Sequence, residues 1–305
     1  MVLPNFLIAG AAASGTSFLS SILMQHTDIY LPKEMRPEPH FFYYSDKYAH
    51  GVEWYKKKWF SDVKKQSAVG ERSSSYLYHK ESAKRISQNL PNIKLIFVLR
   101  NPIERTWANY RYTVLSGLED LSLTDALETE SHRVKNASGI WKEVQPHDYT
   151  GRGLYGEQLE FYLNFFSWSQ ILIINSEKLS SETQIQLDRI TNFLGVKNLE
   201  QFEYPPAFTS LSILNKDVQI KCRKLLGANK FNCIVEAVRR KEFNVDDFSE
   251  DNQEKKVIKS LSNNMVDEKY KIPEKNYEWL ADFFREDQEK FFNISKNYID
   301  FKRWL

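Results

Sequence analysis

Short, continuous apolar runs separated by helical patterns limit this chain to a small set of folds. The clearest runs are NFLIAG at 5–10, IKLIFVLR at 93–100 and QILIINSE at 170–177, with a weaker one, SAVGERSSSY, at 67–76. Runs that are apolar throughout are typical of parallel strands covered by helices on both faces. The sequence therefore predicts an α/β fold of three layers, with a central parallel sheet of four to five strands and right-handed crossovers.

The segments between these runs carry helix signals. The apolar residues between 18 and 23 share one helical face. Asn101 as N-cap, Pro102 at the first helical position and Glu104 at the third form a strong start signal for another helix. Near the end of the chain, IPEKNYEWLADFFREDQEKFF at 272–292 is an amphipathic helical pattern.

The chain has 305 residues, of which 42% are hydrophobic and 14% aromatic, enough to bury a large core. From about Leu199 it becomes polar and charged and lacks clear strand patterns. We expect one domain over 1–305, with an α/β core over 1–198 and a mostly helical C-terminal portion over 199–305 packed on it.

Composition narrows the classes of function. The net charge of +2 is too small to favour general nucleic-acid binding. Cys222 and Cys233 are too few for a disulfide framework or a cysteine metal site. The N-terminus lacks the basic region of a signal peptide, and no stretch approaches the ~18 apolar residues of a membrane span. We expect a cytoplasmic protein.

The segment GAAASGTSFLSS at 10–21 has the layout of a phosphate-binding turn between a strand and a helix. Its small residues let backbone N–H groups converge, its hydroxyl residues add donors, and the following helix points its positive end at an anion. No lysine or arginine precedes Lys33, so the Gly-Lys pair of an ATPase or kinase is missing, and an ordinary tight turn is the alternative. The residues concerned are Gly10, Ser14, Gly15, Thr16 and Ser17.

Two further segments carry candidate side chains. In RPEPHFFYYSDKYAHGVEWY at 36–55, Glu38 and His40 are two residues apart in an extended, proline-bracketed stretch, so both can point to one side. A carboxylate beside an imidazole can act as a general base with a proton-donating partner, and a solvated pair is the alternative. Arg100 ends a buried strand at the edge where open α/β sheets bind ligands, so we expect it to contact an anion.

Seven segments, in the right order, resemble the sulfotransferases that use 3′-phosphoadenosine 5′-phosphosulfate (PAPS), in their bacterial and heparan-sulfate-type branch. The start of the segment at 10–21, called the opening loop from here on, is similar to the family's phosphosulfate loop, G-x-x-[KR]-x-G-T-[ST]. LRNPIERTWANY at 99–110 is similar to its 3′-phosphate segment, L-R-[ND]-P-x-x-R-x-x-S-x-Y. The resemblance covers nearly the whole chain. The other similar segments are EPHFF at 38–42, GVEWY at 51–55, GERSSSY at 70–76, RGLYGEQLEFYLNFF…ILIINSEKL at 152–179 and the terminal KYKIPEKNYEWLADFF…RWL.

The resemblance implies a role for each matching position. Glu38 would be the base that deprotonates the acceptor, with His40 beside it. Arg72 falls where the family often has an active-site lysine. Arg100 would hold the 3′-phosphate. The residues implied in cofactor binding are Ala13, Ser14, Gly15, Thr16, Ser17 and Phe18 in the loop, with Arg100, Ala108, Lys269 and Tyr270.

Three positions depart from the family pattern. Ala13 stands where a lysine or arginine contacts the bridging oxygen, Ala108 stands where a serine contacts the 3′-phosphate, and NNMVDE at 263–268 replaces a loop rich in glycine and lysine. Either Arg72 or Lys33 could compensate for the missing loop cation. The other accounts are a substitution introduced on purpose and a protein that binds the nucleotide without transferring anything.

The resemblance implies a sulfotransferase that moves a sulfuryl group from PAPS to a hydroxyl, or as second choice an amine, of a carbohydrate or small-molecule acceptor. PAP would be the product, and no metal is implied. We expect neither a nucleic-acid partner nor a membrane span. The alternative is a non-catalytic PAP- or PAPS-binding protein or an inactivated variant, and the missing Gly-Lys pair disfavours an ATP-dependent kinase.

Overall fold

The computed structural model describes residues 2–33, 38–205, 211–268 and 270–305, which form two compact units. The first unit consists of Met1–Arg105, Gly151–Pro205 and Ala281–Leu305, and the second of Thr106–Thr150 and Pro206–Leu280. The second unit includes residues 106–150, which the division expected at residue 198 did not anticipate. That the chain forms one domain over 1–305 stays a prediction.

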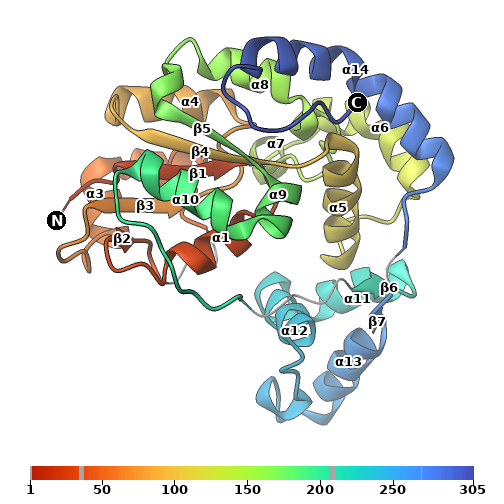
Figure 1. Cartoon of the computed structure of the whole chain (residues 1–305). Helices are drawn as coiled ribbons and strands as arrows, with labels where there is room; N and C mark the ends of the chain where they lie inside the picture. The colour runs from red at the N-terminus through yellow and green to blue at the C-terminus, as the bar shows by residue number, and fades with distance from the viewer. Residues whose placement is uncertain (1, 34–37, 206–210, 269) are drawn as a thin grey trace. The chain divides into compact units, whose positions relative to one another are not determined.

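The described part of the first unit contains five strands: β1 (Phe6–Gly10), β2 (Ile29–Tyr30), β3 (Ala68–Arg72), β4 (Lys94–Leu99) and β5 (Ile171–Asn175). They form one parallel sheet in the order β2-β3-β1-β4-β5 (Figure 1). The predicted α/β class and strand number are confirmed, and each of the four apolar runs contains a strand. The two residues of β2 are too few to give a recognisable pattern.

Alternate residues of the strands point to opposite faces of the sheet. In β4, Leu95, Phe97 and Leu99 belong to one buried apolar cluster, and Ile96 and Val98 to the other. Helices supply the rest of each cluster, so the unit has three layers (Figure 1). On the first face they are α3 (Gly51–Trp59), α4 (Lys80–Asn89), α8 (Tyr155–Tyr162) and α14 (Glu274–Ser295), and on the second α1 (Thr16–Leu23), α9 (Ser176–Ser181) and α10 (Thr183–Leu194).

The pairing of β1 with β3 depends on a glycine. Gly70 lies directly opposite Phe6, and a Cβ atom on Gly70 would come within 2.4 Å of the Phe6 ring. The bare glycine lets the ring lie across the neighbouring strand. The same register pairs Ile8 with Arg72, so Arg72 lies at the carboxyl end of β1, where the opening loop begins.

Helix α5 (Pro102–Leu115) begins in the first unit at Pro102, where the sequence predicts a helix start. The Asn101 side-chain oxygen accepts hydrogen bonds from the backbone N–H groups of Ile103 (2.9 Å) and Glu104 (3.4 Å). These bonds satisfy two N–H groups of the first helical turn. The remaining elements of the first unit are α2 (Ser45–Ala49), η1 (Gly151–Gly153) and η2 (Trp168–Gln170).

The second unit is mostly helical and has its own apolar cluster, with Phe231, Ile234, Ile258 and Leu261 at its centre. Two strands of two residues, β6 (Ser212–Ile213) and β7 (Met265–Val266), pair antiparallel. None of the helices described here or in the first unit combines the length and the apolar character needed to cross a bilayer. The helices lying wholly in the second unit are α6 (Leu123–Lys135), α7 (Ile140–Val144), α11 (Lys216–Leu226), α12 (Ala228–Arg240), η3 (Val245–Asp247) and α13 (Asn252–Asn263).

Candidate active site

The loop over 11–15 joins β1 to α1 with two residues in the left-handed region. Ala13 has a φ of 65° and Gly15 a φ of 91°. Positive φ values turn backbone N–H groups to one side and form concavities that bind anions. The N-terminus of α1 follows at Thr16 and adds its own unpaired N–H groups. The loop therefore has the backbone geometry of an anion site without a basic side chain of its own.

Ser14 has a buried hydroxyl to which the described residues offer no hydrogen bond of ordinary geometry. It lies beside the buried phenol of Tyr155, at the start of α8. Burial raises the pKa of this phenol, while Arg105, the Ser14 hydroxyl and the backbone of Arg100 oppose the rise. An unsatisfied buried hydroxyl in such a loop fits an anionic group of a bound nucleotide. Tyr155 lies in the RGLYGEQL segment, but the sequence alone assigned it no role.

Glu38 lies among three side chains that orient its carboxylate. Ser74 donates to it from the backbone N–H at 2.7 Å and from its hydroxyl at 2.9 Å. The His40 Nε2 atom is 3.3 Å from Glu38, and an Arg72 N–H group donates to the other oxygen. The Glu38 side chain is still 14% exposed. The structure thus brings Glu38, His40 and Arg72 together, and their catalytic roles stay a prediction.

Arg72 connects this carboxylate to the opening loop. The guanidinium nitrogen that contacts Glu38 also donates to the Ser17 hydroxyl, in the first turn of α1, at 3.0 Å. The Arg72 side chain is only 6% exposed, and a charge buried to this extent needs partners. A cation therefore lies at the loop although Ala13 carries none. Lys33, the other residue considered for this place, is exposed.

His40 has a left-handed backbone with a φ of 47°, so the segment is not extended throughout as the sequence suggested. Its backbone N–H donates to the Ser73 hydroxyl at 2.8 Å. Burial lowers the pKa of the imidazole to about 4, and the nearby Glu38 opposes this effect. His40 is therefore neutral near pH 7, and its 3.3 Å contact with Glu38 is not an ion pair.

Arg100 directly follows β4, which runs parallel to β1 and beside it. Within the described residues its guanidinium makes one long contact, of 3.4 Å with Glu104, and its side chain is 33% exposed. An arginine has five N–H donors, so this contact uses a small part of its capacity. Arg100 thus lies at the predicted sheet edge with donors available for an anion.

Two of the sequence-predicted residues belong to the second unit. Ala108 lies in the continuation of α5. The Tyr270 hydroxyl donates to Glu268 at 2.5 Å, and the Tyr270 carbonyl accepts from Trp107 at 3.2 Å. Lys269 lies outside the described residues. The roles of these positions in holding the 3′-phosphate stay predictions.

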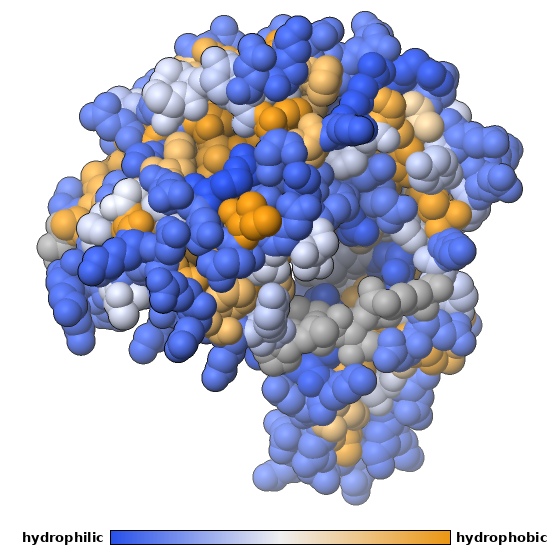
Figure 2. All heavy atoms as spheres, in the orientation of Figure 1, coloured by the Kyte–Doolittle hydropathy of each residue, from blue (hydrophilic) through white to orange (hydrophobic). Residues whose placement is uncertain are grey.

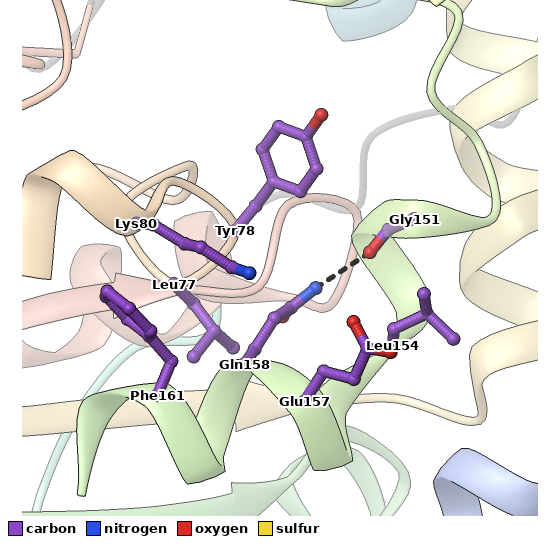
Figure 3. Close-up of a pocket in the computed structure, with 8 residues that line it drawn as sticks. All are labelled: Leu77, Tyr78, Lys80, Gly151, Leu154, Glu157, Gln158 and Phe161. Atoms are coloured by element: carbon purple, nitrogen blue, oxygen red, sulfur yellow. Dashed lines mark hydrogen bonds between the residues drawn. The ribbon is translucent and has the colours of Figure 1, made fainter. Parts of the chain in front are cut away.

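A cavity of about 170 Å³ lies in the first unit between α8 and the segment at 77–80 (Figure 3). Leu77 packs closely against Gly10, the last residue of β1, where a Cβ atom would come within 2.5 Å of the Leu77 side chain. The Arg152 guanidinium lies 4.3 Å from the Tyr78 ring and 3.5 Å from the Ser75 hydroxyl, next to the serine that holds Glu38. The cavity is lined by Leu77, Tyr78, Lys80, Gly151, Leu154, Glu157, Gln158 and Phe161.

Comparisons with known proteins identify several similar sulfotransferases. The chain is 25% identical over 281 residues to the membrane-associated sulfotransferase kil1 of Dictyostelium discoideum, covering 68% of this chain and 59% of the relative. It is 32% identical over 197 residues to heparan sulfate glucosamine 3-O-sulfotransferase 3B1 of Mus musculus, covering 65% and 47%. It thus spans about half the length of the curated relatives it matches.

A crystal structure of a sulfotransferase from Alicyclobacillus acidocaldarius has the same fold, with a TM-score of 0.68 and 23% identity over 96% of each chain. The family model named Sulfotransferase domain matches residues 3–214. This match takes in the opening loop, Glu38, Arg72 and Arg100, and it covers more than half of the chain. The chain belongs to the sulfotransferase domain family.

Proposed function

We propose that this protein transfers a sulfuryl group from PAPS to a hydroxyl group of a carbohydrate or small-molecule acceptor. The observation that carries the proposal is the contact of Arg72 with both Glu38 and Ser17. This contact brings a candidate base, a cation and an anion-binding loop together. Transfer of a sulfuryl group from one oxygen to another requires these three parts. The relatives named for the 3-O-sulfation of glucosamine support a glycan acceptor.

PAPS, when bound, supplies the sulfuryl group and leaves as PAP. The N–H groups of the loop and of the first turn of α1 would bind the phosphosulfate, and Arg100 the 3′-phosphate. Glu38 would take the proton of the acceptor hydroxyl as its oxygen bonds to sulfur and the bond between sulfur and the bridging oxygen breaks. Arg72 would stabilise the charge that develops on that bridging oxygen. Neutral His40 and Ser74 would orient Glu38.

A transfer assay tests the proposal. Radiolabelled PAPS is incubated with the protein and a panel of glycans and small hydroxylated or amine compounds, and calorimetry measures the affinities for PAP and ATP. We expect tight PAP binding, much weaker ATP binding and label on a hydroxylated acceptor. Binding of ATP without PAP would contradict the proposal. PAP binding without transfer to any acceptor would favour the non-catalytic alternative, which Ala13 supports by leaving the loop without its own cation.

Removing the guanidinium at position 100 tests the nucleotide site. Arg100→Ala is expected to weaken PAP binding by more than ~10-fold, or ~1.5 kcal/mol, because it removes a charge-assisted hydrogen bond to a phosphate. Calorimetry with PAP measures the effect. Arg285→Ala, which removes an exposed arginine from α14, is the control and should leave the affinity unchanged. Equal affinities in the two variants would remove Arg100 from the 3′-phosphate site.

We further propose that the cavity beside the site receives part of the acceptor. It offers the aromatic side chains of Tyr78 and Phe161 and the amide of Gln158, which donates to the Gly151 carbonyl at 2.9 Å (dashed line in Figure 3). The amide oxygen of Gln158 is buried and has no hydrogen-bond partner among the described residues, so it can accept from a hydroxyl. Aromatic walls with one oriented amide suit a ring that bears hydroxyl groups.

Truncating one of these walls should affect the acceptor and not the nucleotide. Phe161→Ala is expected to raise the KM for the acceptor by ~5- to 20-fold, because it removes an aromatic contact of ~1–2 kcal/mol. The PAP affinity should stay the same. Phe165→Ala is the matched control, since Phe165 contacts Phe161 but does not line the cavity. The same KM in both variants would place the acceptor elsewhere.

A further inference from the structure

Behind the candidate site lies a carboxyl group that the proposed reaction does not use. Glu71, in β3, is completely buried on the face of the sheet opposite to Arg72. Three hydroxyl groups donate to it: those of Tyr55 at 3.1 Å, Tyr76 at 2.8 Å and Ser73 at 2.8 Å. A carboxyl group in an apolar core is costly unless it is satisfied in this way.

Two of these hydroxyls also accept hydrogen bonds from the backbone that follows Glu38. The Ser73 hydroxyl accepts from the His40 N–H at 2.8 Å, and the Tyr76 hydroxyl accepts from the Phe42 N–H at 3.3 Å. Each forms a relay that runs from a backbone N–H through a hydroxyl to Glu71. The direction of each relay is fixed. The hydroxyl oxygen accepts the hydrogen bond from the N–H group, so the only hydrogen of the hydroxyl can be donated to the carboxylate.

We propose that Glu71 is a positioning residue for sulfuryl transfer, whose buried carboxyl group holds residues 38–42 in place through these two relays. The segment needs such support, because His40 has a left-handed backbone that a residue with a side chain rarely adopts. The inference rests on the proposed role of Glu38 as base. Within the described residues, the hydrogen bonds of Glu71 do not reach the loop, and Glu71 does not line the cavity.

Protonation of Glu71 should weaken the relays, because one of its oxygens then becomes a donor. Burial, with a smaller contribution from the charge of Glu38, raises the pKa of Glu71 to about 7 against the opposing effect of the three hydroxyls. The ionisable groups that face Glu71 are Tyr55 of α3, Tyr76, Glu38 and Lys47 of α2. Turnover should therefore fall as the pH drops through about 7.

The same protonation changes stability in the opposite direction. The folded state, with its raised pKa, binds the proton at a pH where the unfolded chain has lost it, so between about pH 7 and pH 4.5 Glu71 favours folding more as the pH falls. A loss of turnover in this window that accompanies unchanged or increased stability cannot come from unfolding.

Four variants test the inference. Ser73→Ala and Tyr76→Phe each break one relay, and Glu71→Gln places an amide donor against a hydroxyl that must donate. Tyr55→Phe is the matched control, because it removes a hydroxyl bonded to Glu71 that is part of neither relay. Amide hydrogen exchange at His40 and Phe42, the pH dependence of kcat, and PAP affinity are measured for each.

We expect Ser73→Ala to speed exchange at His40 by ~10-fold and Tyr76→Phe to speed it at Phe42, each with a ~10-fold loss of kcat and unchanged PAP affinity. Glu71→Gln should lose the acidic limb near pH 7, and Tyr55→Phe should change exchange and kcat by less than ~3-fold. Equal effects in Tyr55→Phe and the relay variants, or unchanged exchange in the latter, would overturn the inference. Exchange needs no acceptor, so it tests the relays even if the wild type transfers no sulfuryl group. Should Glu71→Gln not fold, Ser73→Ala and Tyr76→Phe decide.

Discussion

Replacing Glu38 by glutamine is expected to lower the turnover of sulfuryl transfer by ~10²-fold or more while PAP affinity changes by less than ~2-fold. Glutamine keeps the shape of the side chain and can still accept from Ser74, but it cannot take the proton of the acceptor hydroxyl. Steady-state kinetics with labelled PAPS measure kcat, and calorimetry measures PAP binding. Glu53→Gln, a change at an exposed carboxylate of α3 paired with Lys56, is the control.

Near-normal turnover in Glu38→Gln would show that another group takes the proton. His40 is the nearest candidate, and the pH dependence of kcat would then follow its pKa of about 4. In that case a Glu38→Gln, His40→Asn double variant should lose the turnover that the single variant kept. If both variants keep full turnover, neither residue is the base.

Arg72→Ala is expected to reduce turnover by ~10²- to 10³-fold, the effect of removing one charge-stabilising donor from an active site. Charge on the bridging oxygen develops mainly in the transition state, so kcat should fall far more than PAP affinity. Arg72→Lys keeps the charge and should retain more turnover than Arg72→Ala. Equal losses of kcat and PAP affinity in Arg72→Ala would instead mean that Arg72 only binds the nucleotide.

A second substitution separates the role of the charge from the role of the arginine. In the wild type Ala13→Lys should change turnover by less than ~10-fold, because Arg72 already lies at the loop. In the Arg72→Ala background the same lysine should recover at least ~10-fold of the lost turnover. Ala13→Ser in the same background is the control. If the double variant recovers no turnover, a cation at position 13 cannot stabilise the charge on the bridging oxygen in this chain.

Strands β4 and β5 were predictable because they are largely buried on both faces and so form almost continuous apolar runs. The start of α5 was predictable because Asn101 caps its own neighbours, which is a local interaction. Contacts between residues far apart in the sequence could not be predicted. Arg72 and Ser17 are 55 residues apart, and their meeting depends on the register of β1 against β3, which no residue pattern reports.

The hydrogen-bond relays between Glu71 and residues 38–42 could not be predicted from the sequence either. Glu71 is an acidic residue in a short strand, and nothing in its neighbourhood indicates that Tyr55 and Tyr76 meet it in the core. The left-handed backbone of His40 was missed because Pro37 and Pro39 indicated an extended segment, although a proline restricts only its own φ and the residue before it. Glu38 and His40 nevertheless lie 3.3 Å apart.

The register of β3 against β1, in which Gly70 lies opposite Phe6, has a consequence for how this protein can change during evolution. β3 carries two opposite charges side by side, and the parity of a residue along the strand decides which face each reaches. A slip of one position would put the Arg72 guanidinium among the buried tyrosines and the Glu71 carboxylate against the opening loop, where it would repel an anion. Insertions and deletions in this five-residue stretch should therefore be far rarer among functional descendants than point substitutions, because one lost codon would exchange the two charges between core and cofactor.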